Sequence, residues 1–213
     1  MDESHTLTTG IRLFDKGGPV MLVLFALSII ALAIILLKLY QFWRTRLLRT
    51  EFIDRTVLTL RTDGIDAALN HLKSNNHPIA QVMQTTLKAV DDPSLAIEDR
   101  DTEINRVGSA EIRNLESYLR GLEVIANLSP LLGLLGTVLG MIKAFARLEN
   151  AGTKVDPAIL AGGIWEALLT TAFGLSVAIP ALAAFYLLEG QVENIRARMK
   201  DTTIRILGIL ASK

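Results

Sequence analysis

Three apolar runs, each long enough to cross a lipid bilayer, set the strongest limit on how this chain can fold. They cover residues 19–37, 124–145 and 157–188. A helix rises about 1.5 Å per residue, so roughly 20 apolar residues cross a hydrocarbon core of ~30 Å. Because the bilayer core offers no water to backbone polar groups, a spanning segment must satisfy them internally, as a helix does. We therefore expect an all-α, polytopic membrane protein with three transmembrane helices.

The charged residues lie mainly outside these three runs, so the chain is a set of spans joined to charged helical parts. The remaining segments are then an N-terminal tail, a central helical region, a short loop and a C-terminal helix, which cover residues 1–18, 38–123, 146–156 and 189–213.

Breaker residues divide the central region into helices. Turn signals at 62–64 and 74–78 separate short amphipathic segments, and Asp91-Asp-Pro93 opens a longer one. No strong stop separates its apolar stripe from the second span, which predicts one helix from Pro93 to about Phe145. A similar stripe follows the third span. Two of the three spans should thus extend into a helical bundle, with ordinary packing as the reason for both stripes.

Lysine and arginine are unevenly distributed among the segments that connect the spans. The segments after the first and third spans are rich in them, whereas the tail and the loop 146–156 have two each: Arg12, Lys16, Arg147 and Lys154. The positive-inside rule then places the N-terminus outside, and residues 38–123 and the C-terminus in the cytoplasm.

The first span could instead be a cleaved signal peptide. Acidic residues precede it, at Asp2, Glu3 and Asp15, and no small-residue cleavage site follows. We therefore expect it to be retained as a membrane helix.

Composition argues against several functions. Lysine plus arginine and aspartate plus glutamate each number 22, a balance that argues against nucleic-acid binding. There is no cysteine, and His5, His71 and His77 lack the spacing of metal ligands, so we expect them at the surface. No nucleophile with a base and no phosphate loop is evident. We expect no enzyme activity, no cofactor and no metal.

Glu166 is the one charged residue of the third span. At the bilayer centre a carboxylate costs at least ~2.5 kcal/mol, so such residues face a bundle interior or an aqueous path and mark ion or proton traffic. Proton conduction is therefore the leading hypothesis. This span should begin at Pro157, with Asp156 as its N-cap.

Small residues form a face on each of the last two spans. In the second span, the motif that contains Gly133, Gly136, Thr137 and Gly140 would let another helix approach closely. The third span has a matching face: Ala167, Thr170, Thr171, Gly174, Ala178 and Ala181. Faces of small residues also occur where helices only pack together, without any role in proton conduction.

Depth gives these faces a functional interpretation. Thr137 lies eight residues before Phe145, and Glu166 lies nine after Pro157, so on antiparallel helices the two should lie at nearly the same level. With Thr170 and Thr171 one turn further in, these hydroxyls could hold a short chain of waters beside the carboxylate.

Two sequence runs carry a resemblance to a known family. The runs Leu128-Ser-Pro-Leu-Leu-Gly-Leu-Leu-Gly-Thr-Val-Leu-Gly-Met-Ile-Lys-Ala-Phe145 and Gly163-Ile-Trp-Glu-Ala-Leu-Leu-Thr-Thr-Ala-Phe-Gly-Leu-Ser-Val-Ala-Ile-Pro-Ala181 resemble the MotA/TolQ/ExbB proton-channel superfamily, and ExbB most. The resemblance covers about residues 126–190. It implies that Thr137, Glu166 and Thr171 are pore-lining polar positions.

The resemblance also implies an assembly and a location. Five such chains would form a homopentameric ring in the bacterial inner membrane, around two copies of an ExbD-like partner whose single span carries an aspartate. Proton flow would then drive work on a TonB-like protein for uptake across the outer membrane. The N-terminus would be periplasmic and the C-terminus cytoplasmic.

Other functions remain open. A TolQ-like role in envelope maintenance is the nearest rival, and a non-conducting scaffold is a second. A flagellar stator fits less well, because MotA-like chains have four spans. A secondary transporter also fits less well, because the three spans of this chain show no inverted repeat.

Overall fold

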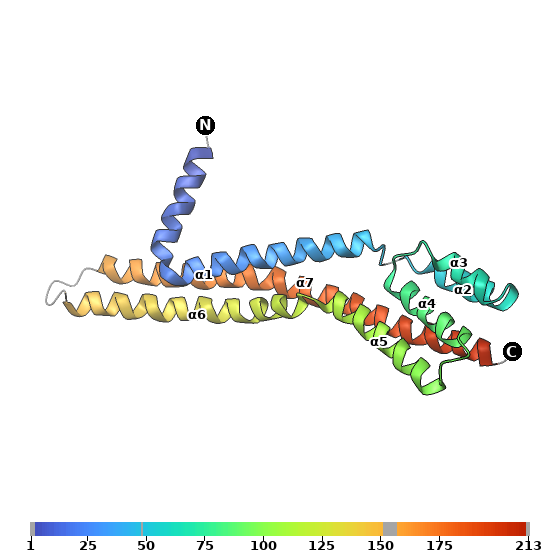
Figure 1. The fold of residues 1–213 in the computed structure, drawn as a ribbon. Coiled ribbons are helices and arrows are strands. Elements are labelled where there is room, and N and C mark those ends of the chain that lie inside the picture. The colour runs from blue at the N-terminus through green and yellow to red at the C-terminus, as the bar shows by residue number, and fades with distance from the viewer. Residues whose placement is uncertain (1–2, 48, 151–156, 212–213) are drawn as a thin grey trace. The chain divides into compact units, whose positions relative to one another are not determined.

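The computed structural model describes residues 3–47, 49–150 and 157–211, and within them every regular element is a helix (Figure 1). The helices are α1 (Glu3–Arg44), α2 (Glu51–Thr62), α3 (Ile65–Leu72), α4 (Pro78–Asp91), α5 (Ile97–Glu116), α6 (Leu119–Asn150) and α7 (Pro157–Ala211). Three stretches are long and apolar enough to cross a membrane: Gly18–Arg44, Ile97–Glu149 and Leu160–Ala211. The predicted all-α class with three transmembrane helices is confirmed. Most of the expected loop, and the expected N-cap Asp156, lie outside the described residues.

The chain divides into two compact units. We call Met1–Leu36 with Tyr118–Tyr186 the membrane unit, and Leu37–Ser117 with Leu187–Lys213 the charged unit. Helices α1 and α7 contribute to both units, because each runs past a boundary between them.

A kink at Gly18 divides α1. Gly18 has a φ of 62°, a conformation that glycine adopts without a Cβ clash, and Pro19 then opens the long apolar segment. Residues 3–17 also form a helix, so the segment that we expected as a tail has regular structure. In the apolar segment, Val20, Met21, Leu24 and Ala31 are buried.

Helices α6 and α7 pack antiparallel in the membrane unit, with glycines at their contact. A Cβ atom added to Gly140 would lie 3.3 Å from Ala167 Cβ, and one added to Gly133 would lie 3.4 Å from Gly174 Cα. In these pairs the residue number increases along α6, from 133 to 140, while it decreases along α7, from 174 to 167. The two helices are therefore antiparallel. Close approach through small residues is how helices gain packing energy in lipid.

In this contact, the closest approach of a glycine to a backbone atom of the other helix is at Gly174. A Cβ added there would meet the backbone carbonyl oxygen of Ser129 at 2.6 Å, and backbone cannot move aside as a side chain can. The outward faces of α6 and α7 carry large exposed apolar side chains, among them Leu131, Leu134, Val138, Trp165, Leu168 and Ile179. Such faces suit contact with lipid or with neighbouring membrane helices.

Within the charged unit, a tight turn ends α1. Arg46 N–H donates to Trp43 O at 3.2 Å, and Leu47 N–H donates to Phe42 O at 3.1 Å. This is the pair of bonds of a Schellman motif, with Arg46 at the left-handed position (φ 49°) and a buried Leu47 after it. Glycine is usual at that position, and a side chain there costs roughly 1 kcal/mol.

Helices α2 to α4 follow the predicted breaker pattern. Helix α2 ends at Thr62 before Gly64, whose φ is 91°, and α4 begins at Pro78. Their apolar faces form a shared core: Ile53, Val57, Leu60, Ala68, Leu72, Ile79, Val82, Met83 and Leu87.

The prediction of one helix from Pro93 to Phe145 is wrong. Helix α5 begins at Ile97 and ends at Glu116, and α6 begins at Leu119. At the break, Ser117 is extended, with a ψ of 137°, and Tyr118 has a φ of 65°. The fully buried Lys38 stabilises the end of α5, because its Nζ donates to the Leu115 carbonyl at 2.9 Å.

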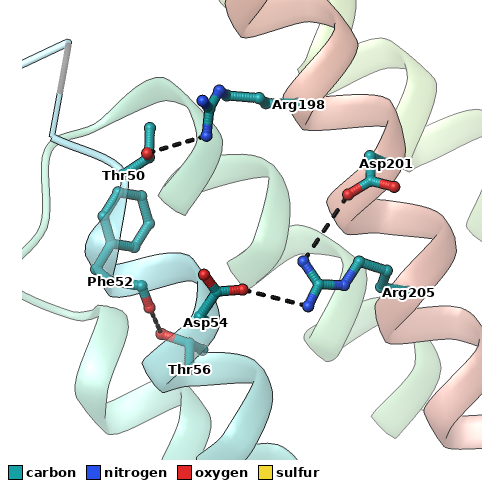
Figure 2. Close-up of polar contacts among 7 residues, drawn as sticks. All are labelled: Thr50, Phe52, Asp54, Thr56, Arg198, Asp201 and Arg205. Carbon is teal, nitrogen blue, oxygen red and sulfur yellow. Dashed lines mark hydrogen bonds and ion pairs between the residues drawn. The ribbon is translucent and has the colours of Figure 1, made fainter.

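Polar contacts join α2 to the C-terminal part of α7 within the charged unit (Figure 2). Arg198 donates to Thr50 Oγ1 at 3.0 Å, and Arg205 pairs with Asp54 at 3.2 Å. Closer to the start of α7, Arg196 forms an ion pair with Glu116 of α5. These exposed pairs orient the helices more than they stabilise them, since each contributes roughly 0–1 kcal/mol.

His77 is not at the surface, contrary to expectation. Its side chain is 2% exposed, its Nδ1 accepts from Ile79 N–H at 3.1 Å, and its Nε2 lies 3.1 Å from Leu47 O. The ring is therefore neutral, with the proton on Nε2, and it caps the start of α4. Burial lowers the pKa of His77, although the bond to Leu47 opposes that shift. His71 is exposed, and the side chain of His5 lies outside the described residues.

Gly174→Ala should lower the thermal unfolding midpoint in detergent. The added methyl meets the Ser129 carbonyl, and overpacking costs roughly 1–3 kcal/mol. The control is Gly190→Ala on the same helix, where nothing lies within 4 Å. That variant should be unchanged or more stable, by up to ~1 kcal/mol of helix propensity. Equal midpoints for the two variants would contradict the close α6–α7 contact.

His77→Asn should flatten the pH dependence of stability. The folded-state pKa of His77 lies below its unfolded value of about 6.5, so its contribution is present above that pH and is lost as the pH falls below it. The wild-type unfolding midpoint should therefore drop between pH 7.5 and 5, and less so in the variant. His71→Asn, which removes an exposed histidine, should retain the wild-type profile. The same slope in all three proteins would exclude His77 as the cause.

Candidate functional site

Two threonines of α7 contact the backbone of α6 at the level of Gly133. Thr171 Oγ1 donates to Gly133 O at 3.1 Å, and Thr170 Oγ1 lies 3.4 Å from the same oxygen. The Thr170 hydroxyl donates at 2.7 Å to Ala167 O of its own helix. The glycines bring the two helices close together. Two short side chains of α7 can therefore reach the Gly133 carbonyl, which also belongs to the helical backbone of α6.

Thr170, which we expected beside a water path, is buried within the contact between α6 and α7. It is 1% exposed, and a Cβ added to Gly136 would lie 2.7 Å from Thr170 Cβ. Thr171 differs, because it is partly exposed while it makes its contact with Gly133. Of the two adjacent threonines, Thr171 is the one that is partly exposed.

Glu166 lies one turn before Thr170 on α7 and is partly exposed. It makes no hydrogen bond or ion pair with any described residue. Its neighbour Ala167 is buried against Gly140, so the carboxylate lies at the margin of the α6–α7 contact. The flanking Trp165 is 60% exposed. An unpaired carboxylate at membrane depth needs a polar neighbour or water, so we expect a further helix to complete this site.

Thr137 does not contact Glu166. Its hydroxyl donates to Leu134 O at 2.6 Å, and the residue borders a groove of about 590 Å³ along α6 that reaches Glu149. The pairs Gly140–Ala167 and Gly136–Thr170 place Thr137 opposite residues 169–170. Glu166 is thus about one helical turn, ~5 Å, nearer the start of α7.

The sequence identified the polar residues of the site but missed two features of its backbone. The Ser129 carbonyl is the group that requires glycine at position 174, and the Gly133 carbonyl is the acceptor for Thr171. Neither is a side chain, so no residue pattern marks it. Among the described residues, no group of three metal-ligating side chains could hold an ion.

Comparison with known protein families matches residues 74–201 to the MotA/TolQ/ExbB proton channel family. This range contains α4 and α5, all of α6, and α7 as far as Asp201. It includes Glu166 and the three threonines of the site.

Individual relatives agree with this match. An ExbB-like 1 protein of Synechocystis sp. is 36% identical over 85% of this chain and 72% of its own length. An ExbB homolog of Methanothermobacter thermautotrophicus is 28% identical over 87% of this chain, but the match spans 65% of that protein. The Tol-Pal system protein TolQ of Haemophilus influenzae is 38% identical over 49% of this chain and 46% of its own length. The chain therefore belongs to the MotA/TolQ/ExbB proton channel family.

Proposed function

We propose that this chain is a proton-channel subunit of the ExbB type, which converts proton motive force into mechanical work on a partner. The observation that carries the proposal is Glu166. It is the one charged residue of the third span, and among the described residues it has no partner. Such a group suits proton exchange, because its proton is not committed to a fixed bond.

The residues around Glu166 have distinct roles in this proposal. The α6–α7 glycine contact holds Glu166 at a fixed depth. Thr171 and Thr137 offer partly exposed hydroxyls within about one turn of it, where they can order water. Thr170 maintains the spacing of the helices. Each proton that moves inward releases ~2.3 kcal/mol per 100 mV, which is the energy available for work.

A complete channel needs more chains than one. The exposed apolar faces of α6 and α7 support assembly into a ring, and the family resemblance supports five copies around an ExbD-like helix that carries an aspartate. In this arrangement the chain lies in the bacterial inner membrane with its N-terminus periplasmic and its C-terminus cytoplasmic. The distribution of lysine and arginine supports this orientation. A TonB-like protein would receive the force.

A TolQ-like role in envelope maintenance is the second candidate. The match to a Tol-Pal system protein favours it over the scaffold alternative, because TolQ is named in the proton channel family whose match covers residues 74–201, and this range includes Glu166. The two roles differ in the partner rather than in the proton step. Rescue of strains that lack ExbB or TolQ would separate them.

Glu166→Gln should reduce proton flux at least tenfold, because it keeps the shape of the side chain and removes the titratable group. The flux would be measured with a pH-sensitive dye in liposomes that contain the chain and its ExbD-like partner. The control is Glu189→Gln, which neutralises an exposed glutamate after the third span and should behave as wild type. Wild-type flux in Glu166→Gln, at equal complex abundance, would remove Glu166 from the mechanism.

Substitution of the three threonines should separate water-ordering hydroxyls from packing. Valine deletes the hydroxyl and serine deletes a methyl group. At Thr137 and Thr171, valine should impair flux severalfold while serine is nearly silent. At Thr170 the order should reverse, because serine leaves a void beneath Gly136. If serine lowers the flux more than valine does at Thr137 and Thr171, the proposal that these hydroxyls order water beside Glu166 is wrong.

A further inference from the structure

A groove of about 570 Å³ lies where α1 ends in the charged unit, and arginines dominate its lining. Arg44, Arg46, Arg49 and Arg55 line it, and Glu51 is the one carboxylate beside them. We call these four arginines the arginine groove. The rest of its lining is polar or aromatic: Thr45, Phe52, His71, Ser74, Asn75, Asn76 and His77.

The four guanidinium groups have no partner within the described part of the chain. Its ion pairs use Arg106, Arg196 and Arg205 instead, and the four groove side chains make no hydrogen bond there. All four residues are exposed. Four unpaired cations beside a single carboxylate therefore form a site for an anion with several acceptor oxygens, because planar guanidinium groups bind phosphate by paired hydrogen bonds.

The backbone supports the same conclusion. Arg46 has a left-handed conformation (φ 49°) at the position of the Schellman turn where glycine is usual. Packing does not explain the choice of arginine, since its side chain is exposed. Strain of this kind is typical of functional sites. The arginine instead adds a fourth cation to the groove.

The groove follows a membrane helix with aromatic residues at its end. Tyr40 is 58% exposed and Trp43 is 79% exposed, on the last turns of α1 after its apolar run. Exposed tyrosine and tryptophan at the end of a span are typical of the headgroup layer. Arg44 directly follows this pair in the sequence, so the groove begins at the depth where lipid phosphates lie.

We propose that the arginine groove binds the headgroups of acidic phospholipids. The occupant is the bilayer itself, because the charge of the groove complements a phosphodiester and the aromatic residues before it mark the interface. A basic cluster immediately after a span attracts anionic lipid, and each arginine changes the affinity about fivefold. The proposal requires only that α1 crosses the membrane, so it does not depend on proton conduction.

Trp43 can report on this binding. The chain has two tryptophans, and Trp165→Phe leaves Trp43 as the single emitter. The full chain would be reconstituted in phosphatidylcholine bilayers with 20% phosphatidylglycerol, with brominated acyl chains on one lipid or on the other. We expect brominated phosphatidylglycerol to quench Trp43 severalfold more than its mole fraction predicts.

Paired variants then test the groove itself. Arg49→Gln/Arg55→Gln should lower the affinity of the groove for phosphatidylglycerol about 25-fold, at about fivefold per arginine, which would bring the quenching of Trp43 close to the value for random mixing. Arg61→Gln/Lys88→Gln removes the same charge from the same unit outside the groove and should retain the preference. Arg49→Lys/Arg55→Lys should retain part of it, which excludes loss of folding as the cause.

Three outcomes would overturn the proposal. The first is random mixing in the wild type, and the second is an equal loss of preference in both neutralised variants. The third is full loss of the preference in 10 mM inorganic phosphate at constant ionic strength, which would assign the groove to a soluble anion. Quenching that depends on protein density, rather than on lipid composition, would instead indicate a second copy of the chain and would also count against lipid.

Discussion

The close contact between α6 and α7 is the interaction on which the rest of the membrane unit depends. In lipid there is no hydrophobic driving force for two apolar helices to associate. Close packing and interhelical hydrogen bonds must supply the free energy of association instead. Glycines at positions 133, 136, 140 and 174 provide the approach. The hydroxyl of Thr171 then reaches the Gly133 carbonyl, which fixes the register of the two helices and with it the depth of Glu166.

The sequence predicted the large elements well, because each had a physical signature. Apolar runs identified the spans, and Gly64 and Pro78 marked boundaries that the structure has. The break at Ser117–Tyr118 could not be predicted, because neither residue is a breaker. The extended backbone there is supported by Lys38, which lies 77 residues from its acceptor Leu115.

The candidate site was predictable in its residues but not in its geometry. A lone carboxylate in an apolar run is conspicuous, so Glu166 could be found from the sequence alone. The difference between Thr170 and Thr171 could not, because adjacent threonines look alike until the register decides which one is buried against Gly136 and which one stays partly exposed. His77 shows the same limit, since its capping role depends on the carbonyl of Leu47, 30 residues away.

The connections between the two units differ in their local backbone structure. Helix α7 has 55 residues and belongs to both units, and Pro180 within it lacks the N–H that would complete the helical hydrogen bonds. Helices α5 and α6 are separated by two non-helical residues, Ser117 and Tyr118. The chain thus passes between its two units twice within a helix, in α1 and in α7, and once at this break, where the backbone leaves the helical conformation.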